Sequence, residues 1–185
     1  MSERKWARQQ YLSSADFRET IEEFRPLLDT FPYALIGGLA VSYYVNPPVT
    51  VDVDFLIEAE PAEMLDAVRS FKAKGWSVGK MFFTDNRKGF PKNGLSLRRE
   101  FKAPYSIVDF LVTGKDEYLI SVVERAEQVE VQRGVPLSVI KVEDLMILKS
   151  LAGREKDIED VIVLTSELEG RFDEEYVNTK IRELE

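Results

Sequence analysis

Two aspartates inside a strongly β-prone segment constrain how this chain can fold. Asp52 and Asp54 alternate with apolar residues in the run Thr-Val-Asp-Val-Asp-Phe-Leu-Ile, whose composition favours a strand. Successive side chains of a strand point to opposite faces, so the two aspartates share one face and Val51, Val53 and Phe55 share the other. We expect the apolar face to pack on the core and the two carboxylates to lie together on the opposite face.

A second segment, residues 105–113, repeats this arrangement around a third acid. Val108 and Phe110 are expected to face the core, with Asp109 on the opposite side. If the two strands are neighbours, three carboxylates converge, and they raise one another's pKa unless a cation neutralises them. A divalent metal is the simplest resolution. The alternative is that the acids lie at strand ends in water or pair with Lys and Arg.

The Gly37-Gly38 pair follows a short apolar segment, residues 33–36, and precedes a helix-like one. Glycine permits a tight turn and lets a ligand approach the backbone amides. The N-terminus of a helix also favours an anion such as phosphate. By itself such a pair is also typical of an ordinary turn, and the chain has neither the G-x-G-x-x-G nor the G-K-[ST] nucleotide motif.

Missing residue types exclude several kinds of chemistry. The chain has no cysteine and no histidine, which excludes disulfides, thiolate metal sites, Ser-His-Asp triads and imidazole bases. Carboxylates are then the natural metal ligands, and they favour Mg²⁺ or Mn²⁺. A net charge of −8 argues against binding nucleic acid through bulk positive charge. No apolar run approaches the roughly 18 residues of a membrane span, and the polar N-terminus has no signal-like core, so we expect a cytoplasmic protein without membrane contact.

Helical and strand patterns mix over most of the chain. Helices are predicted at residues 13–31, 38–45, 61–75 and 116–126, and over most of 141–185. Strands are predicted at residues 33–37, 50–58, 76–83, 95–101 and 105–113, and in a hairpin around Gly134. The fold class is therefore α/β or α+β. We expect a sheet domain at residues 1–140, with C-terminal helices at 141–185 packed on it as one compact unit.

The order of these features resembles the nucleotidyltransferase fold of the DNA polymerase β superfamily. The stretch IGGLAVSYYVNPPVTVDVDFLI is similar to the signature of small bacterial nucleotidyltransferases, including the AbiEii-type toxins and minimal nucleotidyltransferase relatives. The later stretch VEDLMILKSLAGREKDIEDV is similar to the C-terminal motif of that group. Together the similarity runs from Tyr33 to Val161. It implies a mixed β-sheet flanked by helices, with a helical C-terminal part.

The resemblance also implies an activity and its residues. The protein would be a metal-dependent nucleotidyltransferase that moves a nucleoside monophosphate from an NTP, ATP among the candidates, to an acceptor hydroxyl. Asp52, Asp54 and Asp109 would be the catalytic residues and the ligands of Mg²⁺ or Mn²⁺, and Asp109 would help the acceptor hydroxyl attack the α-phosphate. Gly37 and Gly38 would line the phosphate loop.

Charged residues of the later motif have two interpretations. By the resemblance, Lys149 and Arg154 would offset triphosphate charge, and Asp157 would lie near the nucleotide or brace the sheet against the helices. Alternatively, all three are helix-surface charges in i,i+3 or i,i+4 pairs. Arg99, on a predicted strand, is expected on a solvated face or, alternatively, directed toward the phosphates.

Two departures from the family pattern motivate a second hypothesis. Relatives commonly have an Arg where this chain has Pro48, and a His near the end of the first helix, where Tyr44 or Val45 stands. The alternative function is a non-catalytic protein on the same fold that binds nucleotide or a protein partner, as in a toxin–antitoxin pair. The sequence leaves open which NTP is used and whether the acceptor is RNA, protein or a small molecule.

Overall fold

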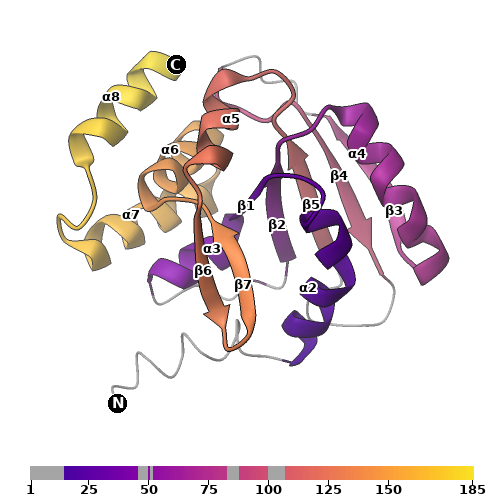
Figure 1. The fold of residues 1–185 in the computed structure, drawn as a ribbon. Coiled ribbons are helices and arrows are strands. Elements are labelled where there is room, and N and C mark those ends of the chain that lie inside the picture. The colour runs from indigo at the N-terminus through magenta and orange to yellow at the C-terminus, as the bar shows by residue number, and fades with distance from the viewer. Residues whose placement is uncertain (1–14, 46–49, 51, 83–87, 100–106) are drawn as a thin grey trace.

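The computed structural model describes residues 15–45, 50, 52–82, 88–99 and 107–185 (Figure 1), and Pro48 and Val51 lie outside this part. The strands are β1 (Tyr33–Ile36), β2 (Asp52–Ile57), β3 (Ser77–Phe82), β4 (Asn93–Arg98), β5 (Ile107–Val112), β6 (Glu127–Gln132) and β7 (Val135–Val139). The helices are α2 (Ala15–Leu28), α3 (Gly37–Tyr44), α4 (Pro61–Val68), the 3₁₀ helix η1 (Arg69–Lys74), α5 (Glu117–Glu124), α6 (Val142–Ala152), α7 (Glu155–Leu168) and α8 (Glu174–Leu184).

All seven strands form one mixed sheet with the order β3-β4-β5-β2-β1-β7-β6. Strand β2 pairs in parallel with β5 and antiparallel with β1, so it occupies the centre of the sheet. Strand β1 pairs in parallel with β7, which forms the expected hairpin with β6. The mixed sheet flanked by helices that the sequence predicts is confirmed.

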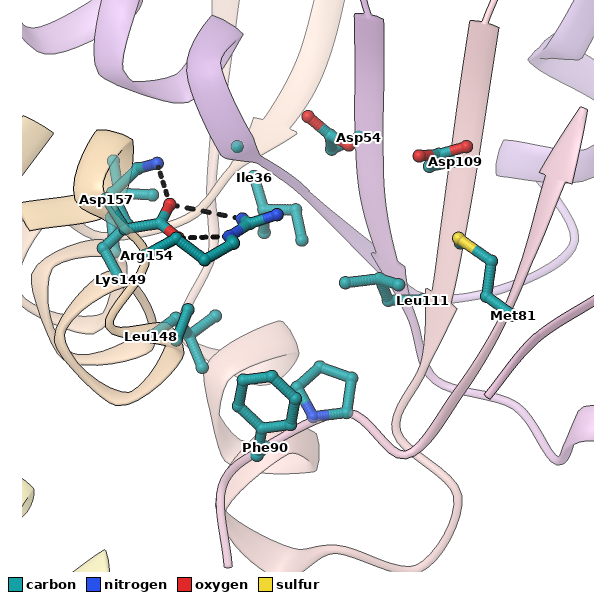
Figure 2. A pocket seen from close by; sticks show the side chains of 14 residues that line it. Ile36, Asp54, Met81, Phe90, Asp109, Leu111, Leu148, Lys149, Arg154 and Asp157 are labelled. Atoms are coloured by element: carbon teal, nitrogen blue, oxygen red, sulfur yellow. Dashed lines mark hydrogen bonds and ion pairs between the residues drawn. The ribbon is translucent and has the colours of Figure 1, made fainter. Parts of the chain in front are cut away.

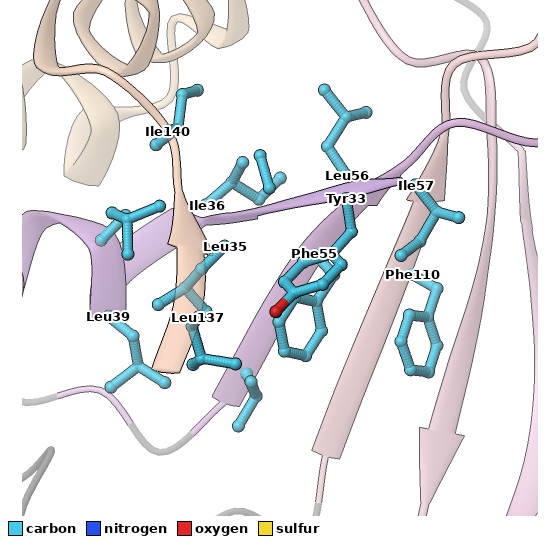
Figure 3. Packing of buried hydrophobic residues seen from close by; sticks show 14 of the residues in the cluster. Tyr33, Leu35, Ile36, Leu39, Phe55, Leu56, Ile57, Phe110, Leu137 and Ile140 are labelled. Carbon is cyan, nitrogen blue, oxygen red and sulfur yellow. The ribbon is translucent and has the colours of Figure 1, made fainter. Parts of the chain in front are cut away.

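The core face of the central strands is apolar, as the alternating pattern predicts. Val53, Phe55, Val108 and Phe110 are fully buried, and Figure 3 shows the Phe55 and Phe110 rings side by side on neighbouring strands. These two rings stack with centroids 5.7 Å apart. Phe24 of α2 packs edge-on against Phe110 at 5.4 Å, so α2 covers this face of the sheet. The opposite face is left to the aspartates.

The predicted helix at residues 61–75 is divided into two elements. Pro61 begins α4, and the backbone N–H of Glu60 donates to the Glu63 carboxylate at 2.9 Å in a capping box. After Val68 the chain tightens into the 3₁₀ helix η1, a frequent way for a helix to end. Gly75, with φ of +86°, then reverses the chain into β3.

The C-terminal helices share the core of the sheet. Gly153 ends α6 in the left-handed conformation with φ of +63°, which permits α7 to turn back along α6. Leu145 of α6, Leu164 of α7 and Val177 of α8 belong to the same buried cluster as the central strands. Among the described residues, no helix is both long and apolar enough to cross a bilayer.

Arg99 fulfils neither role expected of it. Its guanidinium donates to both carboxylate oxygens of Glu23, at 2.6 and 2.5 Å, and lies over the Trp76 ring with 4.3 Å to the centroid. Trp76 is buried and donates its indole N–H to the same carboxylate at 3.1 Å. The three side chains tie α2 to the sheet, because a planar cation can stack on an aromatic ring and bind a carboxylate at the same time.

Candidate active site

Strands β2 and β5 bring two of the predicted acids side by side. The parallel register places Asp54 directly opposite Asp109 and Asp52 opposite Ile107. The condition for the acids to converge, that these two strands are neighbours, is therefore met, and all three aspartate residues are half-buried. Buried Oδ1 atoms of Asp52 and Asp109 have no hydrogen-bond partner among the described residues. Buried polar atoms are nearly always satisfied, so these oxygens are poised for a ligand.

A cavity of about 310 Å³ opens beside this pair of strands (Figure 2). Its charged side is formed by Asp54 and Asp109 from the sheet and by Lys149, Arg154 and Asp157 from the C-terminal helices. Its apolar side includes Ile36, Met81, Phe90, Pro91, Leu111, Leu145 and Leu148. Asp52 and Gly38 lie next to the cavity but are not among its lining residues. The site thus combines converging charges with an apolar wall, as ligand pockets commonly do.

The two glycines are required by the close approach of α3 to β2 and to Thr50. Gly37 begins α3 with φ of +66°, and a Cβ at this position would overlap the carboxylate of Asp54. Gly38 is buried, and its Cβ would lie 2.9 Å from the Cβ of Thr50. Any larger residue would push α3 away from the aspartates. The N-terminus of α3 is consequently held against Asp54.

Burial and mutual repulsion destabilise the ionised carboxylates. Burial is the largest cause that raises the pKa of Asp54 to about 7, and the charges of Asp109 and Asp52 raise it further against the opposing Lys149 and Arg154. Burial also raises the pKa of Asp109, although the Ser96 hydroxyl, which donates to it, and Arg98 oppose the rise. A cation bound between the strands would relieve both effects.

Lys149 lies in a buried ion cluster behind the cavity. Its side chain is only 8% exposed, and its Nζ lies 3.1 Å from Oδ1 of Asp157 and 2.6 Å from Oδ2 of Asp160. The interpretation of Lys149 and Asp157 as helix-surface charges is therefore wrong, since both are buried. The cluster joins α6 to α7 by a contact that surface pairs would not provide.

Arg154 is the exposed member of the same group. Its Nε donates to Oδ2 of Asp157 at 2.5 Å while the side chain remains 79% exposed. Burial alone would raise the pKa of Asp157, but its bonds with Arg154 and Lys149 outweigh this and lower it. Figure 2 shows the Arg154 guanidinium extending from Asp157 toward the side of the cavity that holds Asp54. This cation is available to an anionic ligand.

The donor set fits a magnesium-type ion that a substrate helps to bind. Within the described part of the chain, no three acidic side chains are already arranged as a metal cage. Mg²⁺ seldom needs one, because it is usually held by one or two carboxylates together with substrate phosphates. The unpartnered oxygens of Asp52 and Asp109 and the destabilised charge of Asp54 suit such an ion.

Solved structures of similar architecture include an adenylyltransferase. The chain aligns with the lincosamide antibiotic adenylyltransferase LnuA, lincomycin-bound, at 13% identity and a TM-score of 0.53, over 80% of this chain and 96% of that one. The antibiotic-resistance factor ANT(2'')-Ia aligns at 14% identity and a TM-score of 0.53, over 89% and 88%. JHP933 from Helicobacter pylori aligns at 16% identity and a TM-score of 0.50, over 85% and 68%. At these identities the likeness establishes the nucleotidyltransferase fold.

The family follows from the sequence itself. Residues 17–185 match the family described as "Nucleotidyl transferase of unknown function (DUF2204)", and the chain belongs to it. No curated protein matches the chain in sequence. The fold and the family together identify a nucleotidyltransferase, in agreement with the predicted superfamily.

Sequence reasoning missed the apolar wall of the cavity. Leu111 follows Asp109 by two residues and therefore shares its face of β5, so period-2 alternation was a signal for it. Met81 lies on β3, and Phe90 and Pro91 follow that strand in a loop, so no local pattern connects them with the aspartates. Their placement depends on long-range strand pairing.

Proposed function

We propose that this nucleotidyltransferase is metal-dependent and moves a nucleoside monophosphate from an NTP to an acceptor hydroxyl. The observation that carries the proposal is the register of Asp54 opposite Asp109, beside a glycine turn and a cavity of about 310 Å³. A buried acid pair of this kind is costly for a fold and is expected where the charge is used.

Asp52, Asp54 and Asp109 are the proposed ligands of Mg²⁺ or Mn²⁺. Asp52 and Asp109 each present a buried oxygen with no hydrogen-bond partner in the described part of the chain, and Asp54 lies opposite Asp109 in the sheet register. When bound, such an ion offsets the negative charge of the triphosphate and of the acids themselves. The carboxylates fix its position, because they project from paired central strands rather than from loops.

The proposed triphosphate site lies between α3 and α7. Gly37 and Gly38 direct the N-terminal amides of α3 toward the cavity edge, where phosphate oxygens can accept hydrogen bonds. Arg154 offers an exposed positive charge from the other side, while its Nε and Nη2 donate to Asp157. Lys149 would attract the triphosphate only through its positive charge, without direct contact, because its ammonium group is already paired with Asp157 and Asp160.

The chemistry requires the acceptor to lose a proton as it attacks. The acceptor oxygen forms a bond to the α-phosphorus, the bond to the β-phosphate oxygen breaks, and pyrophosphate leaves. Asp109 is placed to accept the proton, and burial raises the pKa of this carboxyl toward the range where a general base is effective. Burial and the neighbouring acids raise the pKa of Asp54, so a cation bound nearby would favour its ionised form.

A small molecule is the acceptor that we favour. A cavity of about 310 Å³ with apolar side chains on one side suits a small organic compound, and a net charge of −8 disfavours a polyanion. The lincosamide antibiotic adenylyltransferase LnuA, which has the same fold and was solved with lincomycin bound, is consistent with this choice.

The test is transfer from labelled NTPs. The protein is incubated with each of the four NTPs, Mg²⁺ or Mn²⁺, and an acceptor panel of small alcohols, lincomycin and tRNA, and the products are followed by mass shift and pyrophosphate release. Asp52→Ala should abolish transfer, whereas Asp66→Asn, at an exposed α4 residue, should leave it unchanged. An unchanged rate in Asp52→Ala refutes the proposal. Nucleotide binding without pyrophosphate release supports the non-catalytic alternative instead.

A further inference from the structure

The apolar side of the cavity includes a short segment that leads into the sheet. Phe90 and Pro91 line the cavity, and Figure 2 shows Phe90 across from Leu111 and beside Leu148. The segment precedes β4 (Asn93–Arg98) and is not itself part of a strand or helix. Something outside the sheet must therefore fix its position.

Asp116 makes the contact that fixes this segment. Its Oδ2 accepts a hydrogen bond from the backbone N–H of Gly89 at 2.9 Å, and its Oδ1 accepts one from the backbone N–H of Leu119 at 3.0 Å. The second bond is the N-cap of α5. One carboxylate therefore joins the start of a helix to the residue that precedes Phe90.

Two further side chains pack against the same point. Gly89 has φ of +72°, and a Cβ there would lie 2.7 Å from Cδ1 of Tyr118 and 2.9 Å from Cδ1 of Leu184. Tyr118 belongs to α5 and donates its hydroxyl to Asp144 of α6 at 3.0 Å. Asp144 is buried and also accepts from Arg125, the C-cap residue of α5. The segment therefore packs against α5 and the last turn of α8. The bond from Tyr118 to Asp144 also connects it to α6, the helix that carries Leu148.

The position of the wall relative to the aspartates indicates which substrate it contacts. Of the residues proposed to bind the triphosphate, Arg154 lies on the other side of Asp54 from Asp109 (Figure 2), and Gly37 packs against the Asp54 carboxylate. An attacking hydroxyl must lie near Asp109. Leu111 is two residues further along β5 and belongs to the apolar wall, so this wall begins next to Asp109. The part of the acceptor next to its hydroxyl therefore meets apolar side chains.

We propose that Asp116 is a positioning residue that holds the Gly89–Pro91 segment as the acceptor-facing wall, and that this wall selects hydroxyls attached to apolar groups. The choice of acceptor rests on the proposed function, whereas the positioning by Asp116 does not. A polar polyol or a nucleic acid would leave its own polar groups unpaired against Phe90, Met81 and Leu111.

The experiment uses Asp116→Ser in the full chain. Serine keeps an acceptor for the Leu119 N–H and so retains the N-cap, but its side chain is too short to serve Gly89 as well. Hydrogen exchange of the individual amides, followed by NMR, should show Gly89 exchanging at least about tenfold faster, because a hydrogen bond to a charged group is lost. The Leu119 amide should change by less than about threefold. Unchanged exchange at Gly89 overturns the positioning role.

Kinetics with two probe acceptors test the selection. Benzyl alcohol should be used by the wild type with a kcat/KM about tenfold or more above that for glycerol, as expected for an apolar contact. In Asp116→Ser the KM for benzyl alcohol should rise at least about threefold, with kcat and the KM for NTP nearly unchanged. Preference for glycerol, transfer to neither alcohol, or a rise in the NTP KM instead overturns the acceptor assignment.

The matched control is Asp173→Ser. Asp173 is the N-cap of α8, accepts from the Tyr176 N–H at 2.9 Å, and does not line the cavity. The Asp173→Ser variant should leave the exchange rate of the Gly89 amide and the kinetic constants for both alcohols unchanged. Effects equal to those of Asp116→Ser would mean that the loss of a helix cap alone is responsible. A wild type that releases no pyrophosphate from any NTP refutes the proposed function, while the Gly89 exchange still decides the role of Asp116.

Discussion

Replacing Asp54 by Asn should stabilise the metal-free protein above neutral pH. The folded-state pKa of this carboxyl is raised from 3.8 to about 7, chiefly by burial and then by Asp109 and Asp52. Between about pH 4 and pH 7 the folded state therefore binds more protons than the unfolded state, and stability falls as pH rises through this window. Above pH 7 the buried charge of Asp54 lowers the free energy of unfolding of the wild type by its full amount, whereas the neutral side chain of Asp54→Asn carries no such cost.

The size of the effect follows from the pKa. A rise of about three pH units corresponds to about 4 kcal/mol at 1.36 kcal/mol per unit. Asp109, whose pKa is also raised, shares part of this cost, so we expect the variant to gain about 2–4 kcal/mol in the free energy of unfolding at pH 8. At pH 4, where the folded wild-type carboxyl is protonated, the gain should be under about 1 kcal/mol.

Urea denaturation at pH 4 and pH 8, with a chelator present, measures both values. Asp66→Asn is the control, because its carboxylate is 67% exposed in an i,i+3 pair with Arg69 and should change stability by about 0.5 kcal/mol or less at either pH. No gain at pH 8, or the same gain at both pH values, would refute the reasoning. Either result would mean that burial and repulsion do not raise the pKa of the Asp54 carboxyl.

Three further predictions concern the same site. Gly37→Ala should lower the free energy of unfolding by at least about 1–2 kcal/mol in urea titrations and weaken NTP binding in calorimetry, because φ of +66° disfavours a side chain that would also overlap Asp54; unchanged values would contradict it. Lys149→Met should cost about 3–5 kcal/mol by leaving the buried Asp160 without its cation and Asp157 with Arg154 alone, and adding Asp160→Asn should recover part of the loss; a loss under about 1 kcal/mol would mean that the cluster is not coupled. Mg²⁺ at about 100 times its Kd should raise the unfolding free energy of the wild type at pH 8 by about 2.7 kcal/mol, and much less in Asp54→Asn; equal stabilisation of both would place the ion elsewhere.

The sequence by itself determined which side chains share a face. Alternation places Asp52 and Asp54 together and sends Val53 and Phe55 to the core, because the two-residue period of a strand is a local property of the backbone. The glycine turn before α3 was likewise visible, since a positive φ strongly favours glycine. The class of protein was inferred because these local features follow one another in the same order as in the nucleotidyltransferases that the sequence resembles.

Only the tertiary structure decided which of these groups meet. Asp54 and Asp109 became partners through the pairing of β2 with β5, strands that other elements separate in the chain. Lys149 was drawn into a buried cluster rather than left on a helix surface. Phe90 lines the same cavity as Asp54 and Asp109, and Asp116, distant in sequence, accepts a hydrogen bond from its neighbour Gly89. Such contacts depend on how whole elements pack, and packing is a property of the assembled core that no local periodicity encodes.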